Sequence, residues 1–119
     1  MFLEISVAIL LGVSAGVITG LTPGIHINLV SVFVVGMSGF LLSVTSPIPV
    51  AVFLLSMSIT HTFTDALPSI FLGAPDPDTC LNVLPGHKML MQGKGFDAVK
   101  LTVIGSLLSL ILMVMLLPF

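Results

Sequence analysis

Charged residues are absent from two long stretches of this chain. No Asp, Glu, Lys or Arg lies between Ile5 and Thr64, and none follows Lys100 up to Phe119. A helix needs about 20 apolar residues to cross a bilayer, so the first stretch has room for roughly two to three crossings and the second for one. The pattern predicts an all-α polytopic membrane protein.

Turn-forming residues divide the apolar pattern into separate runs. Pro lacks an N–H and disfavours helix in the residue before it, so Pro and Gly clusters mark the breaks. We expect one membrane domain, 1–119, with about four transmembrane or re-entrant helices. The runs cover about 2–20, 24–43, 50–73 and 100–119, and a polar loop occupies 74–99.

Small residues recur at helical spacing in the first and last runs. Gly12, Gly16 and Gly20 share one helix face, and Gly105 and Ser109 repeat the spacing of four. In lipid, such faces let two helix backbones approach closely. We interpret the three glycines as a helix contact and not as a ligand site.

Composition narrows the function classes. The chain is 56% hydrophobic and 7% charged, which excludes an ordinary soluble domain. Its three cations are lysines between positions 88 and 100, too few to hold nucleic acid. Since short, positively charged loops stay inside, we expect the loop 74–99 to be cytoplasmic and the protein to be multi-pass in the cell membrane.

The topology at the N-terminus is left open. A secretory signal begins with positive residues, and Met1 to Glu4 include none. We therefore expect the first run to be a span. If all four runs cross, both termini lie outside. If the first Pro-Gly break forms a re-entrant hairpin, the N-terminus lies inside.

The first break brings polar groups into an apolar setting. Thr22, Pro23 and Gly24 interrupt the pattern, and His26 and Asn28 follow. A half-helix that starts here would offer N–H groups and a positive dipole end, which bind anions. We predict that these five residues contact a substrate, with a Pro-kinked turn between two spans as the alternative.

A second polar group lies near the end of the third run. His61 and Asp65 are four residues apart and share one helix face, and Thr62 lies beside them. Ionisable residues in a membrane helix are costly and suggest function. We predict that His61 and Asp65 bind a coupling Na⁺ or H⁺ with help from Thr62, Thr60 or Thr64, unless Asp65 simply meets water at the interface.

A later Pro-Gly break echoes the first. Pro85 and Gly86 follow a turn that contains Pro75, and facing broken helices build sites in transporters made of repeats. The two breaks fit a site built from facing broken elements. No nucleophile with a base and no metal-ligand set is found, so neither an enzyme nor a cofactor is expected.

Two segments carry a resemblance to a known family. They are Gly16 to Gly24, which ends in Thr-Pro-Gly, and 72–95, which ends in Gln-Gly-Lys-Gly. Together they resemble the N-terminal part of the TctA-type permeases of the tripartite tricarboxylate transporters. The resemblance implies import of di- or tricarboxylates on an ion gradient, with a solute-binding protein and a small membrane subunit as partners. It also implies that the substrate path is lined by Pro23, Gly24, Pro75, Pro85 and Gly86.

We therefore expect a permease, or half of one, that moves a small organic anion. A chain this short would need a second half or a copy of itself, since transporter sites lie between repeats. One alternative is a carrier of phosphorylated membrane lipid, because anion-binding helix ends suit phosphate as well. Another is a non-transporting subunit that docks to a larger partner through its glycine face.

Overall fold

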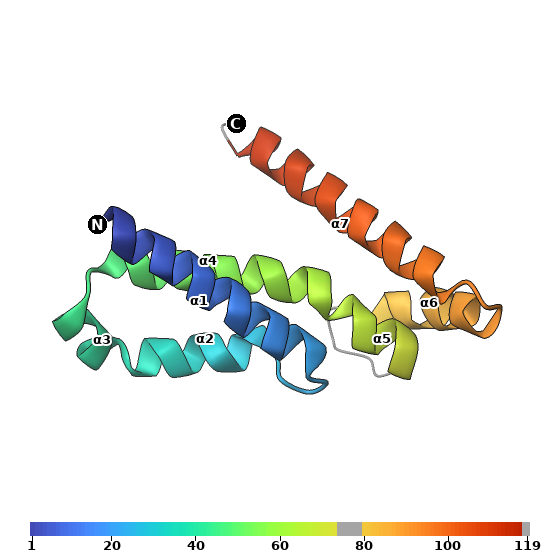
Figure 1. Cartoon of the computed structure of the whole chain (residues 1–119), viewed down its shortest axis with the longest axis horizontal. Coiled ribbons are helices and arrows are strands. Elements are labelled where there is room, and N and C mark those ends of the chain that lie inside the picture. Colours follow the sequence, from blue (N-terminus) through green and yellow to red (C-terminus); the bar gives the residue numbers. More distant parts are fainter. Residues whose placement is uncertain (74–79, 118–119) are drawn as a thin grey trace. The chain divides into compact units, whose positions relative to one another are not determined.

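A computed structural model of the chain describes residues 1–73 and 80–117. Within these residues the backbone is helical and contains no strand, which confirms the all-α prediction (Figure 1). The helices in chain order are α1 (Phe2–Leu21), α2 (Ile27–Gly36), α3 (Ser38–Val44), α4 (Pro47–Thr64), α5 (Ala66–Leu72), α6 (Cys80–Met91) and α7 (Gly95–Leu116).

Three helical stretches are long and apolar enough to cross a membrane. They are α1, the stretch Pro47–Leu72 that holds α4 and α5, and α7. The helices α2 and α3 pass the same test as a pair, bent by 67°, so up to four crossings fit. These helices confirm the prediction of a polytopic membrane protein.

The chain forms two compact units, and the prediction of a single membrane domain stays a prediction. The first is Met1–Asp65 and the second is Ala66–Phe119, and each is described by itself. The boundary falls between α4 and α5. Pro68 has no N–H to donate to the carbonyl of Thr64, four residues earlier, and the helix ends there.

In the first unit, α1 and α4 run side by side in the same direction. Gly12 of α1 lies against Phe53 and Ser56 of α4, and Gly20 lies against His61 and Thr64. The contacts advance together along both helices, so the two are parallel. In Figure 1, α2 and α3 lead from the end of α1 back to the start of α4.

Helix boundaries in this unit differ from the predicted runs. The run 24–43 is split at Met37 into α2 and α3. The third run begins at Pro47 and not at residue 50, because prolines at the first positions of a helix forgo N–H groups that have no partner within the helix anyway.

The second unit packs α5, α6 and α7 around a small core of Ala66, Ile70 and Ala98. The predicted loop 74–99 was wrong in part, since it contains α6 and the start of α7. Gly93, with φ +76°, ends α6. Its N–H donates to the Leu90 carbonyl at 2.9 Å, a left-handed C-terminal cap that polarity alone does not reveal.

Candidate functional site

The surface between α1 and α4 is built from two stripes of small residues. The glycines of α1 at positions 12, 16 and 20 face Ser56, Thr60 and Thr64 of α4, which are also four apart. A Cβ atom added at Gly16 would lie 2.6 Å from the Met57 carbonyl oxygen. Only glycine allows this approach, and we call the contact the glycine seam.

A buried hydrogen bond closes the seam near its C-terminal end. Nδ1 of His61 lies 3.0 Å from the hydroxyl oxygen of Thr19. Both residues are buried, with 4% of His61 and 9% of Thr19 exposed. In a nonpolar setting such a bond stabilises the pairing of two helices by about 0.6 to 1.7 kcal/mol.

The partners of Thr19 indicate which nitrogen of His61 carries a proton. The Thr19 hydroxyl donates to the Gly16 carbonyl at 3.2 Å, and a hydroxyl has one hydrogen. Its oxygen therefore accepts from His61, so Nδ1 bears the proton.

Thr64 and Asp65 complete this end of α4. The Thr64 hydroxyl lies 3.2 Å from the Gly16 carbonyl of α1, within donating distance. Asp65 follows one turn after His61, donates its N–H to the His61 carbonyl at 2.9 Å, and is 7% exposed. The acidic residue is therefore buried.

Of the residues predicted for the ion site, the structure brings His61 and Asp65 to this place. Thr62 is exposed, and its hydroxyl donates to the Ser58 carbonyl of its own helix at 3.0 Å. Thr64 and Thr19 are the residues whose hydroxyls form hydrogen bonds across the seam. Thr64 could be predicted from its spacing, because it continues the stripe from Ser56, whereas no sequence pattern marks Thr19.

The first break forms a tight turn between α1 and α2. The Thr22 hydroxyl donates to the Ile18 carbonyl at 2.7 Å, and Gly24 has φ +89°, which disfavours other residues. Thr22, Pro23 and Gly24 are exposed. The hydroxyl of Thr22 and the glycine at position 24 therefore suit the backbone conformation of this turn.

His26 caps α2 at this turn. Its Nδ1 accepts from the Asn28 N–H at 3.2 Å, while the Leu29 N–H donates to the His26 carbonyl at 3.0 Å. The backbone N–H groups of Asn28 and Leu29, in the first turn of α2, are therefore both hydrogen-bonded to His26. Because Nδ1 accepts, the neutral ring carries its proton on Nε2.

The break and the buried pair meet at one end of the unit. The ring centroids of His26 and His61 are 6.4 Å apart. Two groups predicted from separate parts of the sequence thus lie together. We call Thr19, His26, His61, Thr64 and Asp65 the polar cluster.

The second break belongs to the other unit, where it contributes to packing. Pro85 is exposed in α6, while Gly86 is buried and faces Ile70 of α5. The neighbouring His87 donates from Nδ1 to the Ile70 carbonyl at 3.0 Å. Pro75 lies outside the described residues. A joint site of these residues with the first break stays a prediction.

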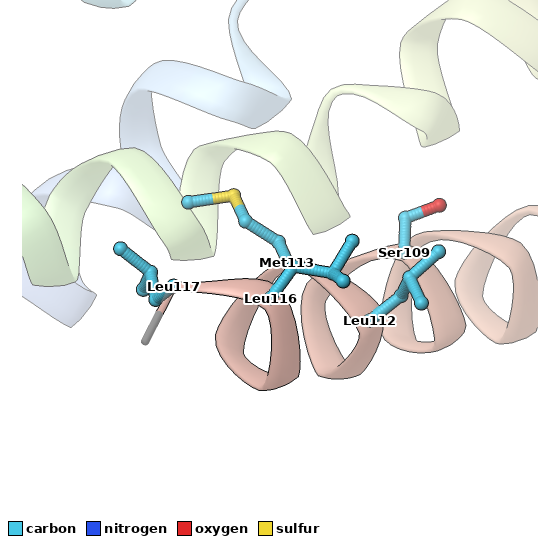
Figure 2. A pocket seen from close by; sticks show the side chains of 5 residues that line it. All are labelled: Ser109, Leu112, Met113, Leu116 and Leu117. Atoms are coloured by element: carbon cyan, nitrogen blue, oxygen red, sulfur yellow. The ribbon is translucent and has the colours of Figure 1, made fainter. Parts of the chain in front are cut away.

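A depression along α7 is a poor anion site. It has a volume of about 460 Å³ and is lined by Ser109, Leu112, Met113, Leu116 and Leu117. Figure 2 shows one hydroxyl among apolar side chains. Its lining residues carry no positive charge that could hold a carboxylate or phosphate. Among the residues that the structure describes, no group of three His, Cys, Asp or Glu could hold a metal ion.

Comparisons with known proteins identify the family. The chain is 39% identical over 103 residues to the uncharacterized protein MJ1079 of Methanocaldococcus jannaschii. This match covers 87% of the chain but 25% of the relative, so the chain spans about a quarter of that protein's length. No solved structure matches the chain.

A family model gives the same answer over nearly the whole chain. The tripartite tricarboxylate transporter TctA family matches residues 7–119. With the apolar helices, this match confirms a multi-pass membrane protein. The resemblance in the sequence is confirmed, and the chain belongs to the tripartite tricarboxylate transporter TctA family.

Proposed function

We propose that this chain forms part of a permease that carries an organic anion, such as a di- or tricarboxylate, and couples its movement to a cation gradient. The family supports the transport class. The observation that carries the coupling is the approach of His26 to His61, because it joins the exposed break to the buried end of the seam.

The exposed side of this site has groups suited to a carboxylate. The exposed Asn28 has a side-chain amide that can donate to a carboxylate, and His26 lies two residues before it. Both follow the turn at Pro23 and Gly24, where the backbone is open to approach. This turn is the proposed contact for the anion.

The buried side of the site suits a cation. Since α1 and α4 are parallel, their C-terminal ends meet at the polar cluster, and each carries partial negative charge. The carboxyl group of Asp65 adds to it. A proton on Asp65 or His61, or a Na⁺ near Asp65, would be stabilised there.

The two rival functions have less support. The glycine seam is occupied by α4 of the same chain, so it offers no surface through which a non-transporting subunit could dock. A carrier of phosphorylated lipid would need a sideways pocket with anion-binding groups, and the depression on α7 is lined by apolar side chains and Ser109. Organic anion transport therefore remains the proposal.

Uptake by vesicles tests the proposal. Radiolabelled citrate is offered to vesicles that contain the protein, under a Na⁺ gradient and, separately, under a proton gradient. We expect one gradient to drive uptake, and Asp65→Asn to reduce this uptake by about tenfold, equivalent to about 1.4 kcal/mol.

Asp97→Asn is the matched control, because Asp97 is an exposed residue of α7 that pairs with the exposed Lys100 at 3.8 Å. It should leave uptake unchanged. Full gradient-driven uptake by the Asp65 variant would remove the coupling role. No uptake of citrate or of other di- and tricarboxylates by the unmodified protein would overturn the permease proposal.

A further inference from the structure

The parallel arrangement of α1 and α4 determines what the segment between them does in a membrane. With 20 residues, α1 spans about 30 Å at 1.5 Å per residue, and α4 with 18 residues spans about 27 Å. Each is long enough to cross the hydrocarbon core. Because they are parallel, both must start on the same face of the bilayer.

A segment that joins two parallel spans has to return across the bilayer. After α1 the chain is on the far face, and at Pro47 it must be back on the near face. A re-entrant hairpin would return it to the far face and make α1 and α4 antiparallel, against the order of contacts at Gly12, Gly16 and Gly20. We infer that α2 and α3 form a single transmembrane span that is interrupted at Met37.

At the interruption Met37 keeps its own backbone hydrogen bonds, as a residue within a span in lipid requires. The Met37 N–H donates to the Phe33 carbonyl at 3.0 Å, and the Met37 carbonyl accepts from Phe40 and Leu41, both at 3.0 Å. The two helices are thus linked through one residue. The chain can therefore bend by 67° at Met37 while the backbone N–H and carbonyl groups of this residue stay hydrogen-bonded.

The lysines then orient the unit. The helices α5 and α6, with seven and 12 residues, are each too short to cross. They also fold back on one another, with Gly86 against Ile70. The lysines at 88 and 94 therefore lie on the face where α1 and α4 end. Positive loops remain inside, so this face is cytoplasmic.

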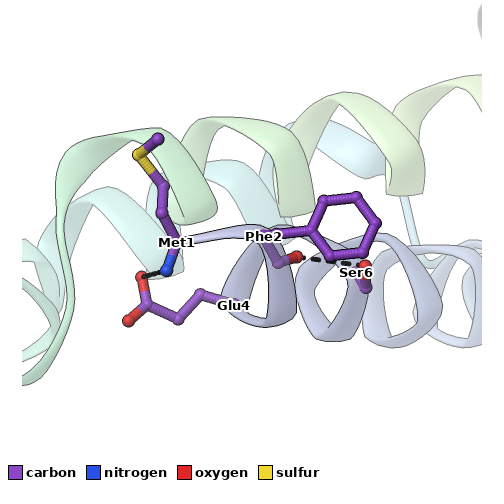
Figure 3. Close-up of polar contacts among 4 residues, drawn as sticks. All are labelled: Met1, Phe2, Glu4 and Ser6. Atoms are coloured by element: carbon purple, nitrogen blue, oxygen red, sulfur yellow. Dashed lines mark hydrogen bonds and ion pairs between the residues drawn. The ribbon is translucent and has the colours of Figure 1, made fainter.

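This orientation assigns a side of the membrane to the polar cluster. The cluster lies within the last turns of α1 and α4, so it is close to the cytoplasmic face, while Thr45 and Ser46 are at the outer face. The N-terminus of α1, where the Met1 amino group pairs with Glu4 at 3.8 Å, is also outside (Figure 3). If the proposed function holds, the cluster is where the anion leaves the carrier.

Cysteine labelling in cells tests the inference. In a Cys80→Ser background, single cysteines replace Pro23 and Ser46, both exposed at turns, and Lys94 in the lysine segment. A membrane-impermeant maleimide is added to intact cells and to permeabilised cells. We expect S46C to react in intact cells, and P23C and K94C to react only after permeabilisation.

Two other labelling patterns would each overturn one part of the inference. Labelling of P23C and S46C from the same side would show that α2 and α3 do not cross. Labelling of P23C and K94C from outside, with S46C protected, would overturn the cytoplasmic placement. Thr22→Cys and Thr45→Cys repeat the test if a variant fails to accumulate. Labelling does not depend on transport, so a failed uptake experiment leaves this inference standing.

Discussion

The helices α1 and α7 are alike in sequence and differ in packing. They have 20 and 22 residues, mean hydropathies of 2.1 and 2.3, and small residues four apart. Yet α1 is buried along its glycines by α4, whereas a Cβ atom added at Gly105 of α7 would have no atom within 4 Å. Hydropathy brings a helix into the membrane, but close packing needs a second stripe of small residues in register.

The largest effect should come from filling the glycine seam. Gly16→Leu forces a side chain against the Met57 carbonyl, and overpacking of this kind costs about 3 kcal/mol. The thermal unfolding midpoint in detergent should fall strongly. Gly105→Leu is the control. A Cβ atom at Gly105 meets no atom within 4 Å, and leucine has a higher helix propensity than glycine, so the unfolding midpoint of this variant should stay the same or rise. Equal losses in the two variants would contradict the packing described for α1.

A smaller effect is expected from the buried hydrogen bond that the seam encloses. A double-mutant cycle of Thr19→Val and His61→Leu should give a coupling free energy of about 1 kcal/mol. Ser14 provides the comparison, because its hydroxyl donates only to the Leu10 carbonyl of its own helix at 2.8 Å. A cycle of Ser14→Ala with His61→Leu should give no coupling. The same coupling in both cycles would show that the Thr19 contact adds nothing.

The smallest effect should separate the two threonines of α4. Thr64→Val removes a hydroxyl that reaches the Gly16 carbonyl and should cost about 0.6 kcal/mol. Thr62→Val removes one that bonds within α4 and should cost close to nothing. Unfolding in detergent compares the two. A larger loss for Thr62 would indicate that its face is covered in the membrane.

Much of the helical organisation could be predicted from hydropathy and from Pro and Gly. The limits of α1 agree with the first run, and the glycine contact could be predicted because Gly12, Gly16 and Gly20 have no other evident role in a helix. The split at Met37 could not be predicted, because glycines such as the nearby Gly36 and Gly39 are frequent in membrane helices.

The site was predicted in parts but not as a whole. His26 and His61 were each chosen as polar groups in apolar surroundings, and nothing in their spacing showed that they meet. Their approach depends on the direction in which α4 packs on α1, which is a property of the pairing and not of either helix. Thr19 was missed because threonine is unremarkable in a membrane helix until its partner is known.

The glycine seam also has a consequence for synthesis. The Gly16 carbonyl and the Thr64 hydroxyl are 48 residues apart in the chain. At about 5 to 20 residues per second, the ribosome needs roughly 2 to 10 seconds to deliver α4 after α1. During that time α1 enters the membrane with its small-residue face uncovered. Early insertion is thus the stage at which the glycine face of a nascent chain can most readily pair with a wrong helix.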